Sequence, residues 1–381
     1  MLYLLIKHHL PFLELHNLGF LRVFTFVTFQ ALAAVMVSFL TVMIFAPSVI
    51  RWLRKQKIGD QPDFAQADIN KLMASKAGTP TMGGLLIIAA ITATTLLIAD
   101  LSNFYVQMAL VCILVLGGVG AIDDWLKLTR ARRQETSRQG LTSLEKLLFQ
   151  IGLAVILSYA TYYYGQDIHA RNQLYFPFIK DYALPLSAAA FVFIGTFIMV
   201  GASNSVNLTD GLDGLASGCM AITGFSFIIL SLIVGVSDIA HFLNFPYIQA
   251  SGQMAVLAGA ITGSCLGFLW YNCNPARVFM GDTGSLALGG LIGYIALVIR
   301  QELMLAVIGG IFVAECLSVM LQVTYFKYTR KKYGEGRRIF LMSPLHHHFQ
   351  KKGWTETQVV TRFWLIGAML AAMALATVKL R

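Results

Sequence analysis

Long apolar segments alternate with short polar connections along almost the whole chain. We expect about ten of them to cross a membrane, since about 20 apolar residues span the hydrocarbon layer. They lie near residues 21–46, 79–99, 104–122, 144–165, 184–202, 212–234, 251–270, 284–300, 302–326 and 358–378. Pro47 is expected to end the first span, and only Arg300-Gln301-Glu302 separates the eighth from the ninth. The pattern predicts an all-α, polytopic membrane protein that forms one domain over residues 1–381.

Composition and charge agree with that prediction and add an orientation. The chain is 57% hydrophobic and 13% charged, about half the charge of a soluble protein. Its net charge of +10 is concentrated in the loops that follow the odd-numbered spans. The positive-inside rule places these loops in the cytoplasm and both termini on the periplasmic side. The basic excess indicates anionic lipid headgroups or anionic substrates at the inner face, and no nucleic acid.

One polar stretch, Ser203–Gly214, lies between two apolar runs and contains Asn207, Asp210 and Asp213 but no lysine or arginine. If the stretch is helical, these three side chains fall at i, i+3 and i+6 on one face. Gly211 lets another backbone or a ligand approach closely. Carboxylates at a membrane edge bind a metal, a hydroxyl-bearing substrate or another cation. The plainer alternative is a solvated turn with helix-capping side chains.

Four further polar groups stand at the ends of apolar runs on the same predicted side of the membrane. They are Lys76, the pair Asp123-Asp124, Asp282 near two glycines, and the histidines 346–348. Adjacent residues on a helix point about 100° apart, so Asp123 and Asp124 are expected to have different partners, with Lys127 a candidate for one of them. A snorkelling lysine, a solvated helix end and an N-cap are the plain alternatives. The convergence favours metal-assisted phosphoryl transfer, with Mg²⁺ held by carboxylates and phosphate met by lysine and histidine.

Five segments in order resemble one enzyme family: Lys-Ala-Gly-Thr-Pro-Thr-Met-Gly-Gly (76–84), Asp-Asp (123–124), Asn-Leu-Thr-Asp-Gly-Leu-Asp-Gly (207–214), Phe-Met-Gly-Asp-Thr-Gly-Ser (279–285) and Pro-Leu-His-His-His-Phe-x-x-x-Gly-Trp-x-Glu (344–356). The family is the polyprenyl-phosphate N-acetylhexosamine-1-phosphate transferase superfamily, in its phospho-N-acetylmuramoyl-pentapeptide branch. The resemblance implies a ten-helix enzyme of the bacterial inner membrane, commonly a homodimer, with its active site facing the cytoplasm. It would use Mg²⁺ to transfer phospho-MurNAc-pentapeptide from its UDP-linked precursor to undecaprenyl phosphate, giving lipid I and UMP.

The resemblance also implies roles for individual residues. Asp282 would ligate Mg²⁺, and Asp123 and Asp124 would be catalytic or close to the lipid phosphate. The remaining implied contacts are to substrate: the nucleotide–sugar cleft by Asn207, Asp210 and Asp213, the uracil by Gly211, Leu212 and Phe279, the nucleotide by Asn272 and Lys76, and phosphate or substrate by His346 and His347. We count His346 among the catalytic residues.

One position departs from the family pattern. Members often have a lysine directly before the Gly-Leu that follows the Asp-Asp loop, whereas this chain has Gln139 there, with Arg138 beside it. The role of that lysine is therefore open, and Arg138 is the candidate substitute.

Three other functions are compatible with parts of the pattern. A sister enzyme of the superfamily would use UDP-N-acetylglucosamine. An ion-coupled transporter would also carry intramembrane acids, but near mid-span rather than at one end. A structural scaffold would tolerate Asp282→Asn. The pattern leaves open whether the lipid phosphate attacks directly or through a covalent carboxylate intermediate.

Overall fold

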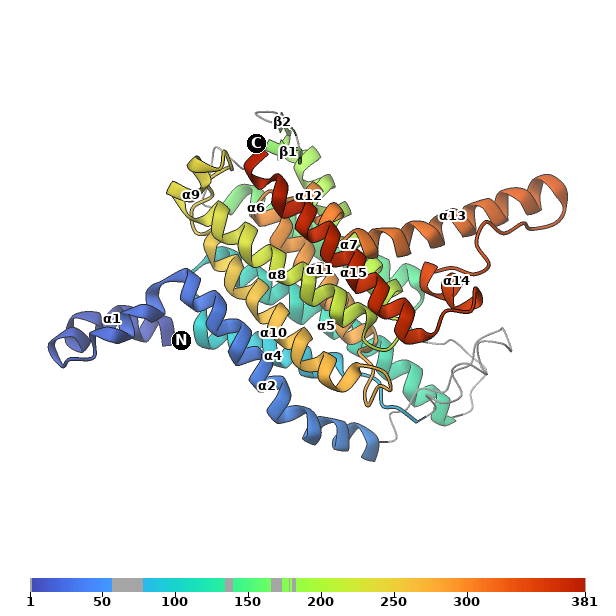
Figure 1. Ribbon diagram of the computed structural model, residues 1–381, viewed down its shortest axis with the longest axis horizontal. Helices are drawn as coiled ribbons and strands as arrows, with labels where there is room; N and C mark the ends of the chain where they lie inside the picture. The colour runs from blue at the N-terminus through green and yellow to red at the C-terminus, as the bar shows by residue number, and fades with distance from the viewer. Residues whose placement is uncertain are drawn as a thin grey trace.

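The computed structural model describes residues 2–56, 78–133, 140–165, 173–177, 179 and 183–380. Figure 1 shows a bundle of helices, with one short antiparallel ribbon in the described part, β1 (Gln173–Tyr175) paired with β2 (Ala183–Pro185). The helices are α1 (Leu2–Leu15), η1 (Gly19–Thr25), α2 (Val27–Lys55), α4 (Gly84–Ile98), α5 (Phe104–Arg133), α6 (Ser143–Tyr164), α7 (Ala188–Thr209), α8 (Leu215–Gly235), α9 (Ser237–Phe242), η3 (Ser251–Gln253), α10 (Met254–Asn272), α11 (Gly281–Val298), α12 (Glu302–Ile308), α13 (Gly310–Tyr333), α14 (Leu345–Lys351), α15 (Glu356–Ala376) and η4 (Thr377–Leu380).

Each of the ten predicted apolar runs falls on a helix. Among the described residues, nine helices are long and apolar enough to cross a bilayer, and α4 is a shorter apolar helix of 15 residues. The prediction of an all-α, polytopic membrane protein is confirmed. The orientation of the termini stays a prediction.

Three predicted boundaries are wrong. Pro47 lies inside α2, which continues to Lys55, because a proline removes only one helical hydrogen bond and packed membrane helices tolerate the loss. The second run begins as a helix at Gly84 rather than near residue 79, because the Pro80 carbonyl and the Gly83 N–H are hydrogen-bonded to the backbone of Phe279 instead. The short helix α12 stands between the eighth and ninth spans, and the ninth begins at Gly310.

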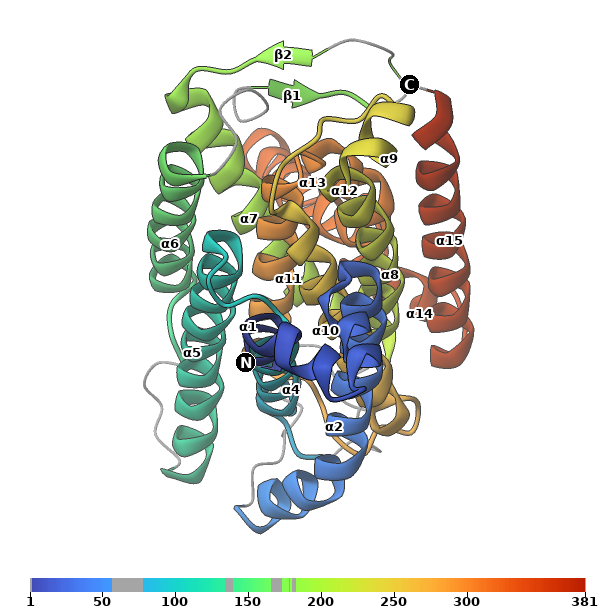
Figure 2. The same cartoon turned by 90° about the vertical axis from the view of Figure 1, so that its left-hand side faces the viewer.

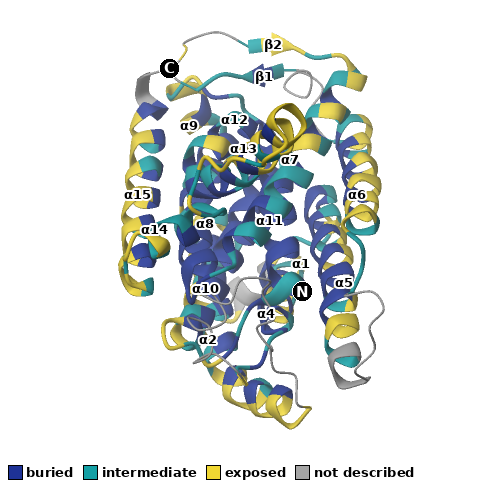
Figure 3. Ribbon diagram, turned by 90° about the vertical axis from the view of Figure 1, so that its right-hand side faces the viewer, coloured by how far each residue is buried: buried dark blue, intermediate teal, exposed yellow. Residues whose placement is uncertain are grey.

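Helix α11 forms the centre of the bundle. It packs against α5 and α7, while α10 packs against α2 and α8. The ribbon in Figure 2 and the burial colours in Figure 3 show α11 enclosed by helices whose outer faces are exposed. Large side chains along α11, such as Tyr294, are fully buried, so the helix is surrounded by protein rather than by lipid.

Helices α13 and α14 bring the C-terminal third of the chain back to the bundle. Figure 1 shows α13 projecting sideways, followed by a return to α14 beside α15. Helix α14 packs against both α13 and α15. This return places the histidine segment on the bundle although it lies more than 60 residues beyond the start of α11.

Candidate active site

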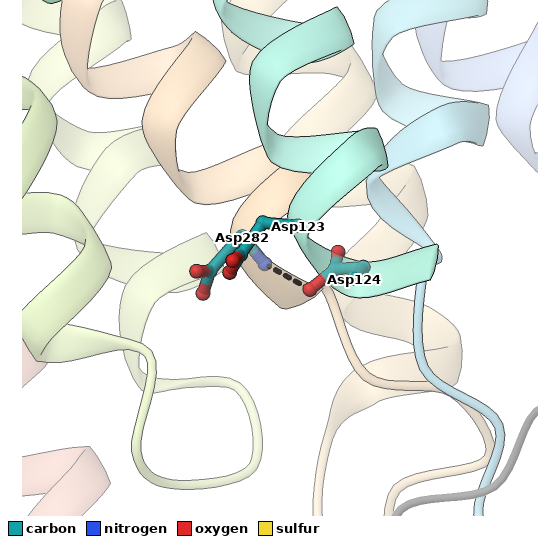
Figure 4. Close-up of side chains that lie close together, drawn as sticks. All are labelled: Asp123, Asp124 and Asp282. Carbon is teal, nitrogen blue, oxygen red and sulfur yellow. Dashed lines mark hydrogen bonds between the residues drawn. The ribbon is translucent and has the colours of Figure 1, made fainter. Parts of the chain in front are cut away.

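Three carboxylates meet where α11 begins. Asp282 lies in the first turn of α11, and Asp123 and Asp124 lie on α5. One oxygen from each can be chosen so that all three lie within 4.8 Å of one another. Figure 4 shows the three side chains close together. The approach requires a glycine at position 120, because a Cβ there would lie 2.3 Å from the Asp282 carbonyl oxygen. The two helices are therefore in backbone contact at this point.

Asp124 caps the start of α11. One of its oxygens accepts the Asp282 N–H at 3.2 Å, drawn dashed in Figure 4, and the other accepts the Thr283 N–H at 2.9 Å and hydroxyl at 2.6 Å. The first N–H groups of a helix have no acceptor within it, so this carboxylate supplies one. Asp124 thereby fixes the position of Asp282, and its neighbour Asp123 has different partners, as the helical spacing predicts.

Two lysines bridge Asp123 and Asp282. Lys127 Nζ lies 2.7 Å from Asp123 Oδ2 and 3.1 Å from Asp282 Oδ2, and Lys146 Nζ lies 3.1 Å and 2.9 Å from the same oxygens. The other Asp123 oxygen accepts the Leu141 N–H at 2.8 Å. The sequence pattern pointed to Lys127 and missed Lys146. A signal existed, because Lys146 follows the capping box of α6, at a helix start where cations are disfavoured.

The Asn/Asp stretch is helical only in its first half. Helix α7 ends at Thr209, and Gly214 takes a left-handed φ of +80°. The placement of Asn207, Asp210 and Asp213 on one helix face required the stretch to be helical, and it is therefore wrong. Asn207, still on the helix, donates to Asp282 Oδ1 at 2.8 Å. Burial raises the pKa of Asp210 to about 7, reinforced by the charge of Asp282, while a hydrogen bond from the Gly281 N–H opposes the shift.

Asp213 and Asn272 hold two loops together. Asp213 Oδ2 accepts hydrogen bonds from the Asn274 side chain at 3.2 Å and the Ala276 N–H at 3.0 Å. Asn272 accepts the Gly214 N–H at 3.1 Å and donates from its amide to a backbone carbonyl at 2.9 Å. Both predicted substrate residues thus lie where the turn after α7 meets the segment before α11.

Phe279 belongs to that same segment and also joins the start of α4. Its N–H donates to the Pro80 carbonyl and its carbonyl accepts the Gly83 N–H, each at 2.8 Å. The ring is partly buried. Lys76, predicted to lie nearby, is outside the described residues, as are Arg138 and Gln139.

The three consecutive histidines have three different environments. His346 is 1% exposed and lies against the turn after α7, since a Cβ on Gly211 would be 2.3 Å from its Nε2. The next residue, Leu212, is buried. His347 Nδ1 lies 2.8 Å from the side chain of Gln350, and His348 Nδ1 accepts the Leu341 N–H at 3.1 Å. The three side chains therefore point to different partners, as expected for consecutive residues, and are not arranged around one metal.

The donor set at the start of α11 fits a hard divalent cation. Within the described chain, Asp123, Asp124 and Asp282 are the group of metal-capable side chains that comes together. Carboxylate oxygens suit Mg²⁺, and no sulfur or imidazole ligand lies in the group. Together with Asp210 the acids outnumber the two lysines, so a cation would share Asp123 and Asp282 oxygens with the ammonium groups.

Comparison with known families agrees with this geometry. The family model for glycosyl transferase family 4 matches residues 106–300, just over half of the chain, and this range contains all three clustered carboxylates. A second match, to phospho-N-acetylmuramoyl-pentapeptide-transferase signature 1, covers residues 76–88, which include the start of α4. The chain therefore belongs to glycosyl transferase family 4, among the phospho-sugar transferases of the phospho-N-acetylmuramoyl-pentapeptide transferase and polyprenyl-phosphate hexosamine-1-phosphate transferase type.

Proposed function

We propose that this protein transfers phospho-MurNAc-pentapeptide from UDP-MurNAc-pentapeptide to undecaprenyl phosphate, the first membrane step of peptidoglycan synthesis. An oxygen of the lipid phosphate forms a bond to the sugar-linked phosphorus, and the bond from that phosphorus to the bridging oxygen breaks. UMP leaves with the bridging oxygen, and the lipid carries the sugar pyrophosphate, lipid I. The observation that carries the proposal is the meeting of three carboxylates and two lysines at the start of α11, in a chain with the signature at 76–88.

Each side chain has a task in this reaction. Bound Mg²⁺, with Asp282 as its ligand, would neutralise charge on the pyrophosphate. Asp124 keeps Asp282 in place through its hydrogen bonds to the start of α11. Lys127 and Lys146 hold Asp123 and Asp282 together, and their ammonium groups are the donors nearest to an incoming phosphate. Asp123 remains the candidate for the proton acceptor or the nucleophile.

The nucleotide-sugar would lie along the loops that Asp213 and Asn272 join. Asn207, Asp210 and Leu212 stand on one side of that junction and Phe279 on the other, with His346 beside Gly211 and His347 next to His346. A half-buried aromatic ring next to backbone groups suits a uracil, which stacks and forms hydrogen bonds at its edge. Lys76 is proposed to contact the nucleotide, on the strength of the signature alone.

The cellular setting belongs to the same proposal. We place the start of α11 on the cytoplasmic face of the bacterial inner membrane, because the positive-inside rule assigns the basic loops of the sequence to that face. A homodimer is proposed from the family resemblance alone. Cysteine labelling of loop positions in intact cells would test the orientation, and mass measurement in lipid nanodiscs would test the dimer.

The deciding experiment uses purified protein, undecaprenyl phosphate, Mg²⁺ and either UDP-MurNAc-pentapeptide or UDP-N-acetylglucosamine, with UMP as the readout. UMP release with the first sugar and its loss on chelation support the proposal. Release with only the second would assign the chain to the sister activity. Solute flux in sealed vesicles without UMP release would favour a transporter and overturn the proposal.

A further inference from the structure

Glu315 is a fully buried carboxylate inside a membrane-spanning helix. It lies on α13 with 0% of its side chain exposed, in an apolar part of the sequence. A buried acid in such a position is costly and is normally paired with a functional partner. The partner here comes from 31 residues away in the chain: Glu315 Oε1 accepts the His346 N–H at 3.1 Å.

The same carboxylate faces the His346 ring. Glu315 Oε2 lies 3.2 Å from His346 Nδ1 as a close charge contact without hydrogen-bond alignment, and neither atom has a hydrogen-bond partner among the described residues. Nε2, on the opposite side of the ring, is also without a partner and points at Gly211, where a Cβ would come within 2.3 Å of it. The imidazole therefore extends from the buried acid to the turn that contains Asp210 and Gly211.

This placement determines which ring nitrogen carries the proton. A neutral imidazole has one N–H, and an ionised carboxylate only accepts hydrogen bonds. An ionised Glu315 oxygen 3.2 Å from Nδ1 repels a lone pair there and stabilises an N–H, so the proton belongs on Nδ1, and Nε2 keeps a lone pair directed at the turn after α7. Carboxylates behind functional histidines set the tautomer and ring orientation in this way in other sites.

We propose that Glu315 is a positioning residue that fixes His346 as the Nδ1–H tautomer and presents Nε2 beside Gly211 as an acceptor for a substrate donor group. The assignment of a substrate contact to Nε2 rests on the proposed function. The tautomer itself does not, because it follows from the contacts of Glu315 and can be measured without substrate.

The first test is ¹⁵N NMR of histidine-labelled protein in lipid nanodiscs, with the His346 signals assigned by their loss in His346→Asn. We expect protonated Nδ1 and unprotonated Nε2. Glu315→Gln should reverse this, because the amide oxygen continues to accept the His346 N–H and the NH₂ group then faces Nδ1. Glu315→Asp should keep the original tautomer. A wild-type Nε2–H form, or no change in Glu315→Gln, overturns the proposal.

The second test is a double-mutant cycle on UMP release. Changing a residue that orients a functional side chain typically costs about 10–100-fold in activity, which is the loss expected for Glu315→Gln alone. In the His346→Asn background the same change should cost less than about twofold, because it acts through the ring. Glu335→Gln, which changes an exposed acid just beyond α13, should leave the rate unchanged. Equal losses in both backgrounds would show that Glu315 does not act through His346.

The two measurements separate this inference from the proposed function. If the wild-type protein releases no UMP but shows the expected tautomer shifts, the proposed function fails and the positioning role of Glu315 stands. If UMP is released and the tautomer does not respond to Glu315→Gln, the proposed function stands and the positioning role of Glu315 fails.

Discussion

Helix α11 has buried charge at both ends, and the two ends differ in how that charge is satisfied. At its start, one oxygen of Asp282 accepts a hydrogen bond from the Asn207 side chain, and the other contacts two lysine ammonium groups. Just beyond its last turn, Arg300 and Glu302 lie 3.7 Å apart, and each has a buried polar atom without a hydrogen-bond partner in the part of the chain that the structure describes. At one end each carboxylate oxygen of Asp282 has a partner, whereas at the other a buried donor and a buried acceptor both lack one among the described residues.

The difference indicates what each end can do. Lys127 is partly exposed and shares its acceptors with Lys146, so under the proposed function a substrate phosphate would draw either ammonium group away without leaving a carboxylate unpaired. Arg300 has no such freedom, because it donates to the Leu297 carbonyl and its guanidinium lies 4.2 Å from the centre of the Phe191 ring. An isolated buried ion pair contributes little to stability. The start of α11 is suited to chemistry and its far end to helix packing.

The largest expected effect comes from removing the charge at the start of α11. Asp282→Asn keeps the shape of the side chain but leaves two ammonium groups with less negative charge between them and weakens the cation site. UMP release should fall by about 10³-fold or more, as when a main electrostatic group of an active site is lost. Glu302→Gln is the matched change at the far end and should retain most of the activity. If Asp282→Asn keeps more than a tenth of the wild-type rate, the start of α11 is not the functional end of the helix.

The redundancy of the two lysines can be tested separately. Lys146→Met removes one ammonium group while preserving the length of the side chain, and we expect UMP release to fall by about 10²-fold. Because Asp123 and Asp282 then have one competing cation fewer, the Mg²⁺ concentration that gives half-maximal rate should decrease. A rate loss with a higher Mg²⁺ requirement would show instead that Lys146 helps to hold the cation site.

The sequence predicted where the charged residues of the site lie better than it predicted which side chains they contact. Apolar runs end where charges begin, so Asp123 and Asp282 could be assigned to the ends of apolar runs on one side. The lysine that joins them could not, because Lys146 meets Asp282 only through the packing of α6 beside α5 and α11. Glu315 had a signal, as an acid within an apolar run, but its partner His346 depends on the return of the chain after α13.

The close approach of α5 to α11 provides a smaller, purely geometric test. Gly118 and Gly120 lie two residues apart on α5, but a Cβ on Gly120 would come 2.3 Å from the Asp282 carbonyl oxygen, whereas a Cβ on Gly118 would meet nothing within 4 Å. Gly120→Ala should displace Asp282 and lower UMP release by about tenfold, below the about 10²-fold that a 1 Å misplacement costs. Gly118→Ala should leave the rate unchanged. Equal effects would mean that the distance between the helices is not critical.

The smallest expected effect concerns pH and the far end of α11. Burial raises the pKa of Glu302 from 4.5 to about 7, with the charge of Arg300 opposing the shift only in part. Between these two pH values, the folded state keeps a proton that the unfolded state has already released. The free energy of unfolding should therefore fall as pH rises from about 4.5 to 7 and then level off.

Thermal unfolding in detergent between pH 5 and pH 8 would measure this change, and Glu302→Gln should remove it. The variant cannot release the proton, so its midpoint should match the wild type at pH 5 and exceed it at pH 8 by a few degrees. Asp238→Asn, which alters an acid at the start of α9, provides a control that should keep the wild-type slope. If Glu302→Gln is less stable than the wild type at pH 8, then the charged carboxylate pairs with Arg300 favourably, and the two ends of α11 are more alike than their contacts indicate.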